Sequence, residues 1–184
     1  MMSPRSLRIA IATTTLALAT AAGAIPPGAT APDFKGTDSN GQTQTLSQYK
    51  GKYVVLEWHN QGCPYEQKLY HSGTMEALQK QWTGKGVVWL SIISSAPGTQ
   101  GYVTPAEENA YMKKMSAAPT ATILDPTGKL IYVGAIDDQP SPDPNTLKGA
   151  RNYVSEALTE SMSGQPIKVA STRSYGCSVK YAGE

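Results

Sequence analysis

Residues 52–66 read KYVVLEWHNQGCPYE, and this stretch decides the fold. Its first part, Lys52 to Trp58, is a short run rich in β-branched and aromatic residues, which predicts a buried strand. Cys63 and Pro64 then open a helix, because proline is favoured at the first helical position, where its missing N–H would be unpaired anyway. A cysteine at this junction lies beside unpaired backbone N–H groups, which together with the helix dipole favour the reactive thiolate. The other interpretation is a small buried Cys63 that only packs.

The segments that follow predict further strands and helices in alternation. Residues 87–93, 120–124 and 130–133 are apolar runs that indicate three more strands. Thr104 and Glu107 form a capping box around Pro105, which predicts that a helix begins there. A strand–helix–strand order implies a parallel pair, whereas the tight turn at 125–128 implies an antiparallel pair. The sequence therefore predicts an α/β domain with a central mixed sheet flanked by helices.

Three local signals complete this prediction. Asn40-Gly41 predicts a hairpin turn in the lead-in before the first strand. Ser72-Gly73 predicts a break in the first helix. Near the C-terminus, apolar residues at helical spacing predict one face of a last helix, namely Leu147, Ala150, Val154, Leu158 and Met162.

Length and composition are those of one folded domain. The chain has 184 residues, of which 40% are apolar and 16% charged, so it can bury a core and is not a disordered protein. The formal net charge is +2, and two of the positive charges, Arg5 and Arg8, lie in a segment that we expect to be removed. The 14 basic and 14 acidic residues that remain balance each other. This balance gives no electrostatic reason to expect nucleic acid or an anionic membrane as a partner.

The N-terminus predicts an export signal over residues 1–24. Arg5 and Arg8 make a basic start, residues 9–22 carry no charge, and Ala22-Gly23-Ala24 supplies the small residues of a cleavage site. A membrane anchor is the alternative, but the run is shorter than the roughly 20 apolar residues that a span needs. We therefore expect one domain, residues 25–184, exported to the periplasm or secreted, with no stable membrane anchor.

Six motifs spread over nearly the whole mature chain carry a family resemblance: Ala31-Pro32-Asp33-Phe34, Leu46 to Lys52, Asn60-x-x-Cys63-Pro64-Tyr65, Asp125 to Lys129, Gly134 to Asp138, and Ser174 to Tyr181. In these motifs the chain resembles the thioredoxin-like redoxin family, in its peroxiredoxin-like branch of alkyl hydroperoxide reductases and thiol-specific antioxidants. The resemblance implies a thioredoxin-like fold. It also implies a thiol-dependent oxidoreductase, in which the Cys63 thiolate attacks a peroxide or a disulfide and a reducing thiol partner restores it. We expect no cofactor and no metal. The alternative is a binding module that has lost catalysis and docks a partner or a metal.

The chain departs from the family pattern near Cys63. Glu66 occupies the position of the second cysteine in the C-x-x-C motif of thioredoxins, so an intrahelical dithiol is impossible. Asn60 stands where peroxiredoxins place a threonine or serine, and Leu56 where they place a proline. A stretch that relatives carry before the final hairpin is missing here. Pro119 is therefore expected to act as the cis-proline that faces the reactive cysteine, and an ordinary trans proline is the alternative.

The remaining candidate residues are Cys177, the two histidines and an acidic pair. We expect Cys177 to resolve an oxidised Cys63 by forming a disulfide, and the alternative is an unreactive thiol in a terminal strand. His59 and His71 are interpreted as packing or surface residues in preference to proton-transfer groups. Asp137-Asp138 is interpreted as a solvated loop pair in preference to a cation site.

Overall fold

The computed structural model describes residues 24–93, 95–112 and 120–181. The expected signal segment lies outside these residues except for Ala24, and Pro119 lies outside them as well. Both the export signal and the cis-proline therefore stay predictions.

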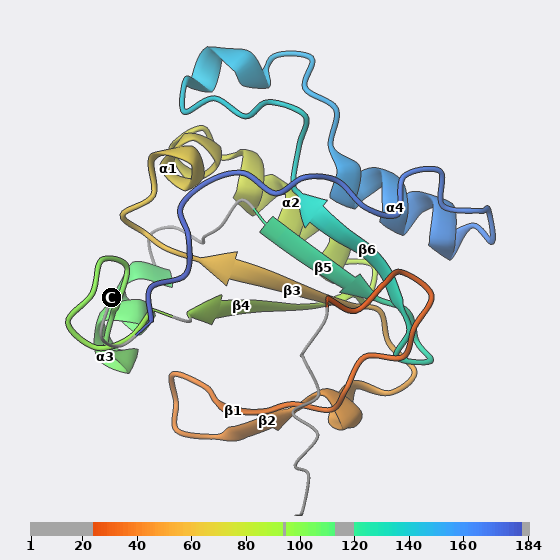
Figure 1. Cartoon of the computed structure of the whole chain (residues 1–184), viewed down its shortest axis with the longest axis horizontal. Coiled ribbons are helices and arrows are strands. Elements are labelled where there is room, and N and C mark those ends of the chain that lie inside the picture. The colour runs from red at the N-terminus through yellow and green to blue at the C-terminus, as the bar shows by residue number, and fades with distance from the viewer. Residues whose placement is uncertain (1–23, 94, 113–119, 182–184) are drawn as a thin grey trace, which may run out of the picture.

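Four strands form the central sheet, in the order β4-β3-β5-β6 (Figure 1). They are β3 (Val54–His59), β4 (Val88–Ile93), β5 (Thr120–Leu124) and β6 (Leu130–Ala135). β3 pairs in parallel with β4 and antiparallel with β5, and β5 pairs antiparallel with β6. The predicted mixed sheet is thus confirmed.

In the described residues, four α-helices connect and flank these strands, and two of them begin at Pro64 and Pro105, as the local signals predict. α1 (Pro64–His71) and α2 (Thr74–Thr83) lie between β3 and β4, α3 (Pro105–Met112) precedes β5, and α4 (Tyr153–Met162) follows β6. The break between α1 and α2 is at Gly73, whose φ of +73° is a left-handed conformation that glycine adopts without strain. None of the helices in the described part of the chain is long and apolar enough to cross a membrane.

One face of the sheet packs against α1, α2 and α4. Val55 of β3 and Ile123 of β5 point to this face and meet apolar side chains of the three helices, among them Leu69, Trp82 and Leu158. The indole N–H of Trp82 donates to the hydroxyl oxygen of Ser155 at 3.1 Å, which ties α2 to α4. This is the main core, and it places α1, with Cys63 at its start, firmly against the sheet.

On the other face the sheet packs against the short 3-10 helix η1 (Leu46–Tyr49), which follows the N-terminal hairpin of β1 (Lys35–Thr37) and β2 (Thr43–Thr45). Leu46 packs with Val54 and two buried leucines of the sheet in a second, smaller core. The hairpin turns where it is expected, since Gly41 has a φ of +78°.

The last helix is shorter than the apolar spacing predicts. Leu147 belongs to a separate 3-10 turn, η2 (Pro144–Leu147), and α4 begins only at Tyr153. Gly149, with a φ of +79°, ends any continuous helix between them, and the side chain of Asn152 caps α4 by accepting from the N–H of Ser155 at 2.8 Å. The prediction that Leu147 and Ala150 share the helix was therefore wrong.

Residues 171–181 form a tail with no strand or helix of its own. After a single bridge between Ser171 and Val133, the tail runs from the region of α4 past α1 towards α3 (Figure 1, dark blue). Its far end is held by the N–H of Ala96, which donates to the carbonyl of Lys180 at 2.9 Å. The alternative of a terminal strand around Cys177 is therefore wrong.

Candidate functional site

Cys63 lies at the junction of β3 and α1, as the sequence predicts. It is the residue that caps α1, and its carbonyl accepts from the N–H groups of Glu66 and Gln67 at 3.0 and 2.9 Å. Its own N–H donates to the carbonyl of Asn60 at 2.9 Å, which closes a tight turn after the strand. Only 1% of Cys63 is exposed, so the thiol sits at the start of a helix but beneath the surface.

Cys177 lies directly against Cys63, although 114 residues separate them. The backbone N–H of Cys177 donates to the Sγ atom of Cys63 at 3.3 Å. Partial loss of solvent around the thiol and the neighbouring Cys63 raise the pKa of Cys177 to about 11, so the Cys177 thiol stays protonated at neutral pH. Both residues are free thiols, and Cys177 is exposed. The structure thus brings the two sequence-predicted cysteines together.

The loop after β4 closes over the turn at Cys63. The side-chain amide of Gln100 donates to the carbonyl of Gly62 at 3.2 Å. Gly101 has a φ of +89°, and a Cβ there would lie 2.5 Å from the Cγ of Asn60, so only glycine fits. Asn60 in turn accepts from the N–H of Gly62 at 3.0 Å. Asn60, the residue at the threonine position of peroxiredoxins, therefore braces the turn that holds Cys63.

A buried charged cluster lies beside this turn. His59 is 3% exposed; its Nδ1 pairs with Oε1 of Glu66, and its Nε2 lies 3.5 Å from Oε2 of Glu108. The second oxygen of Glu66 accepts from the N–H of Asn60 at 2.7 Å. Burial alone would lower the pKa of His59, but Glu108 and Glu66 outweigh it and raise that pKa to about 9. Burial also raises the pKa of Glu66. His59 is thus a buried, paired residue, whereas His71 is exposed.

A second buried acid, Glu57, lies two residues earlier on β3. Its carboxylate accepts hydrogen bonds from four side chains, those of Tyr70, Gln79, Trp89 and Ser91. Burial outweighs these bonds and raises the pKa of Glu57 to about 8. Glu57 is therefore largely protonated at neutral pH.

The prediction of a solvated Asp137-Asp138 pair was wrong for Asp137. Asp138 is exposed, but Asp137 is only 3% exposed because the tail packs over it. Its Oδ1 atom accepts from the hydroxyl of Tyr175 at 2.5 Å and from the N–H of Gln139 at 2.7 Å. A tail residue two positions before Cys177 is thus fixed to the end of the sheet.

Sequence reasoning missed the partners in these clusters. Glu66 drew notice only as a missing cysteine, although three residues separate it from Cys63, a spacing that brings two side chains to the same side of a helix. Glu108 and Tyr175 carry no local signal, because each finds its partner only in the folded chain. Among the described residues, no group of three or more His, Cys, Asp or Glu side chains is arranged to hold a metal ion.

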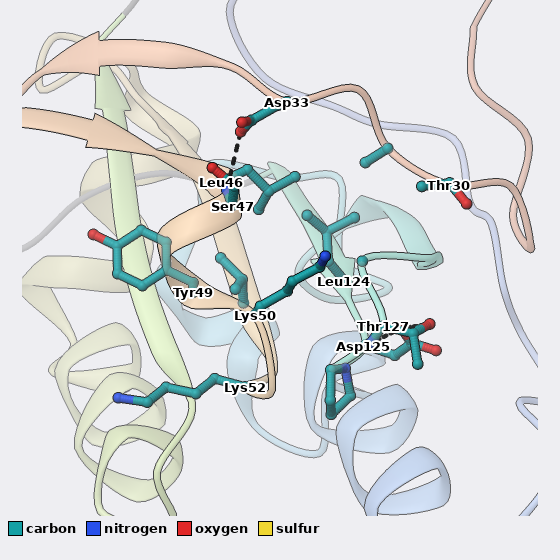
Figure 2. A pocket seen from close by; sticks show the side chains of 14 residues that line it. Thr30, Asp33, Leu46, Ser47, Tyr49, Lys50, Lys52, Leu124, Asp125 and Thr127 are labelled. Carbon is teal, nitrogen blue, oxygen red and sulfur yellow. Dashed lines mark hydrogen bonds between the residues drawn. The ribbon is translucent and has the colours of Figure 1, made fainter.

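A shallow pocket of about 160 Å³ lies at the opposite end of β3 (Figure 2). Val54, the first residue of β3, lines it, whereas Cys63 follows the last residue of the same strand. Figure 2 shows Lys50, Lys52 and Asp125 at its rim, and Asp33 held by the N–H of Ser47. The pocket is therefore separate from the two cysteines.

The chain is similar to known proteins both in sequence and in fold. Residues 27–132 match the model of the AhpC/TSA family. An uncharacterised conserved protein from Geobacillus kaustophilus superimposes with a TM-score of 0.67 at 20% identity, over 86% of this chain and 94% of that one. A hypothetical protein from Sinorhizobium meliloti 1021 gives 0.65 at 18% identity, over 88% and 98%. No curated protein matches the sequence. At these identities the two structures show a shared fold alone.

Proposed function

Because this chain belongs to the AhpC/TSA family and has a thioredoxin-like fold, we propose that it is a thiol-dependent oxidoreductase in which Cys63 attacks and Cys177 resolves. Membership of a thioredoxin-like redoxin family supports a general redox role. The observation that carries the finer proposal is the contact between the N–H of Cys177 and the sulfur of Cys63 at 3.3 Å. Two free cysteines whose residues are in contact are one two-electron oxidation away from a disulfide.

The proposed reaction with a hydroperoxide proceeds in two steps. The Cys63 thiolate attacks the terminal peroxide oxygen, so an S–O bond forms, the O–O bond breaks, and the alkoxide leaves and takes up a proton as the alcohol. The Cys177 sulfur, after losing its proton, then attacks the sulfur of the Cys63 sulfenic acid. An S–S bond forms and water leaves. With a disulfide as oxidant, Cys63 instead forms a mixed disulfide that Cys177 displaces, releasing two thiols.

The burial of Cys63 favours a small oxidant. The sulfur is covered by the tail, and Cys63 is only 1% exposed. A hydroperoxide needs room for two oxygen atoms at the sulfur, whereas a protein disulfide needs an open surface around it. We therefore place a small hydroperoxide first among the oxidants and a disulfide second. The Cys63–Cys177 disulfide is returned to two thiols by an external dithiol, which supplies both electrons.

The test compares the wild type with Cys63→Ser and Cys177→Ser, each offered hydrogen peroxide and, separately, oxidised glutathione. The wild type should consume peroxide and form a Cys63–Cys177 disulfide that mass mapping detects. Cys63→Ser should fall to the background rate, because the attacking sulfur is gone. Cys177→Ser should react once and accumulate a Cys63 sulfenic acid that dimedone traps, because no resolving thiol remains.

Three outcomes would count against this proposal. Oxidation of Cys177 with Cys63 left reduced would reverse the roles of the two cysteines. A Cys63 oxidised to higher acids while Cys177 stays free would leave a monothiol protein. No reaction of the wild type with either oxidant would favour the alternative, a redoxin fold that binds a partner without catalysis.

A further inference from the structure

The tail that carries Cys177 is fixed at a cluster of three residues that we call the latch: Tyr175, Asp137 and Lys68. The Tyr175 hydroxyl donates to Oδ1 of Asp137 at 2.5 Å. The ammonium group of Lys68 lies 3.8 Å from the same oxygen and 5.3 Å from the centre of the Tyr175 ring. The latch therefore joins the tail to α1 and to the segment after β6.

The latch is built on a rigid and buried base. Asp137 and Lys68 are each only 3% exposed. Lys68 is held by the carbonyl of Gln139, to which it donates at 2.6 Å, and Asp137 by the N–H of the same residue. Tyr65 adds a tilted ring contact with Tyr175, with ring centroids 5.8 Å apart. Asp137 and Lys68 belong to the body of the domain, and Tyr175 is the member of the latch that belongs to the tail.

The tail has two further anchors, one on each side of the latch. The N–H of Ala135 donates to the hydroxyl oxygen of Thr172 at 2.9 Å. The tail can come this close only because residue 134 is glycine, since a Cβ on Gly134 would lie 2.1 Å from the same hydroxyl oxygen. At the other end the carbonyl of Lys180 accepts from Ala96. Tyr175 lies between these anchors, two residues before Cys177. It is therefore the side chain that fixes how the middle of the tail lies over Cys63.

We propose that Tyr175 is a positioning residue, which through Asp137 and Lys68 holds the tail closed over Cys63. The closed tail keeps the N–H of Cys177 on the Cys63 sulfur and excludes bulky reagents from it. When the Tyr175 hydroxyl leaves Asp137, the middle of the tail moves away and Cys63 becomes accessible. If the proposed function holds, on which this consequence rests, the latch also sets the effective concentration of Cys177 at Cys63.

The first experiment measures access to Cys63 without any catalytic assay. In a Cys177→Ser background, which keeps the backbone N–H at 177 and removes the competing thiol, iodoacetamide alkylates Cys63. Tyr175→Phe should raise the alkylation rate about tenfold, because a hydrogen bond to a charged acceptor is typically worth at least that factor in an equilibrium. Urea unfolding of both proteins checks that they are equally folded.

The matched control is Tyr53→Phe in the same background. The hydroxyl of Tyr53 is hydrogen-bonded to the hydroxyl of Ser161 on α4 at 3.1 Å, outside the latch, so this variant also loses a tyrosine hydroxyl bond. Tyr53→Phe should leave the alkylation rate unchanged. An equal rise in both variants would indicate general loosening and overturn the proposal, as would an unchanged rate in Tyr175→Phe.

The second experiment returns both cysteines and measures the equilibrium of the Cys63–Cys177 disulfide with glutathione. Tyr175→Phe should shift this equilibrium towards the dithiol by about the same factor, tenfold, because the tail spends less time at Cys63. A shift without any change in alkylation would contradict the latch. If no disulfide forms even in the wild type, the proposed resolving role fails while the alkylation result still decides the latch.

Discussion

Glu57 and Glu66 are two buried acids, nine residues apart in the sequence, that are held in opposite ways. Glu57 is surrounded by neutral hydrogen-bond donors of Tyr70, Gln79, Trp89 and Ser91. Glu66 faces the imidazole of His59, with a backbone N–H on its other oxygen. Burial raises the pKa of both acids, but the side chain paired with Glu66 is basic, whereas the side chains that bond Glu57 are neutral donors. One acid is therefore kept as a neutral polar group and the other as part of an ion pair.

The buried side chains of β3 become more polar along the strand towards Cys63. Val55, Glu57 and His59 alternate along the strand and so point to the same face. Along that face an apolar residue is followed by a neutral acid and then by a charged histidine. The buried charge, which is expensive to hold, lies beside the turn of the proposed reactive cysteine. At the far end of β3, by the pocket in Figure 2, Lys50 and Lys52 are exposed to solvent.

The largest effect is expected from removing the charge of Glu66. Glu66→Gln leaves a buried His59 with Glu108 at 3.5 Å as its remaining carboxylate. We expect the free energy of unfolding at pH 6.5 to fall by about 3 to 5 kcal/mol, because breaking the buried ion pair leaves a buried charge that Glu108 compensates only in part. Urea denaturation followed by circular dichroism measures this change.

Glu57→Gln is the matched control for Glu66→Gln, since it makes the same chemical change in a second buried acid, which lies on β3 instead of α1. At pH 6.5 Glu57 is mainly protonated, because its pKa is about 8. A neutral amide then replaces a neutral acid, and we expect a loss of only about 1 kcal/mol. Equal losses in the two variants would show that the two acids are not held differently.

A change of pH is expected to have an intermediate effect on the free energy of unfolding. Folding raises the pKa of Glu57 from 4.5 to about 8, so its contribution is full below pH 4.5 and lost as pH rises through 8. Folding raises the pKa of His59 from 6.5 to about 9. The contribution of His59 to the free energy of unfolding is therefore full below pH 6.5 and lost as pH rises through 9. The free energy of unfolding should therefore fall by roughly 2 to 4 kcal/mol between pH 6.5 and 8, and further towards pH 9.

Glu57→Gln separates the two contributions to this pH dependence. The variant should lose the part that belongs to Glu57, below about pH 8, and keep the part that belongs to His59. Urea midpoints measured at half-unit intervals from pH 5 to 9 provide the comparison. A wild type that becomes more stable towards pH 9 would contradict both assignments.

The smallest effect is expected at Gln79, one of four donors to Glu57. Gln79→Met removes the bond at 3.0 Å and keeps a similar volume. At pH 6.5 the loss should be about 1 kcal/mol, because three donors remain. At pH 9, where Glu57 is ionised, the loss should be larger, because that bond favours the charged form. A loss that is the same at both pH values would mean that Glu57 does not titrate in this range.

The sequence predicted the elements of the fold better than the contents of its site. The strand before Cys63 and the hairpin turn at Asn40-Gly41 were confirmed because each depends on residues close in the chain. The last helix was predicted too long, since apolar spacing at Leu147 and Ala150 continued across a left-handed Gly149. Asp137 was misjudged because its burial comes from a tail that arrives about forty residues later; the Tyr175 bond spans 38 positions.

By itself the sequence determined what short-range physics controls. A buried strand, a turn, and a cysteine followed by proline place Cys63 at the start of a helix, and the alternation of strand and helix signals predicts an α/β fold. Only the tertiary structure decided that Cys177 lies on Cys63, that Glu66 pairs with His59, and that Tyr175 reaches Asp137. Such contacts join segments up to 114 residues apart. Whether such contacts form depends on how the whole intervening chain packs, and a local sequence pattern does not contain that information.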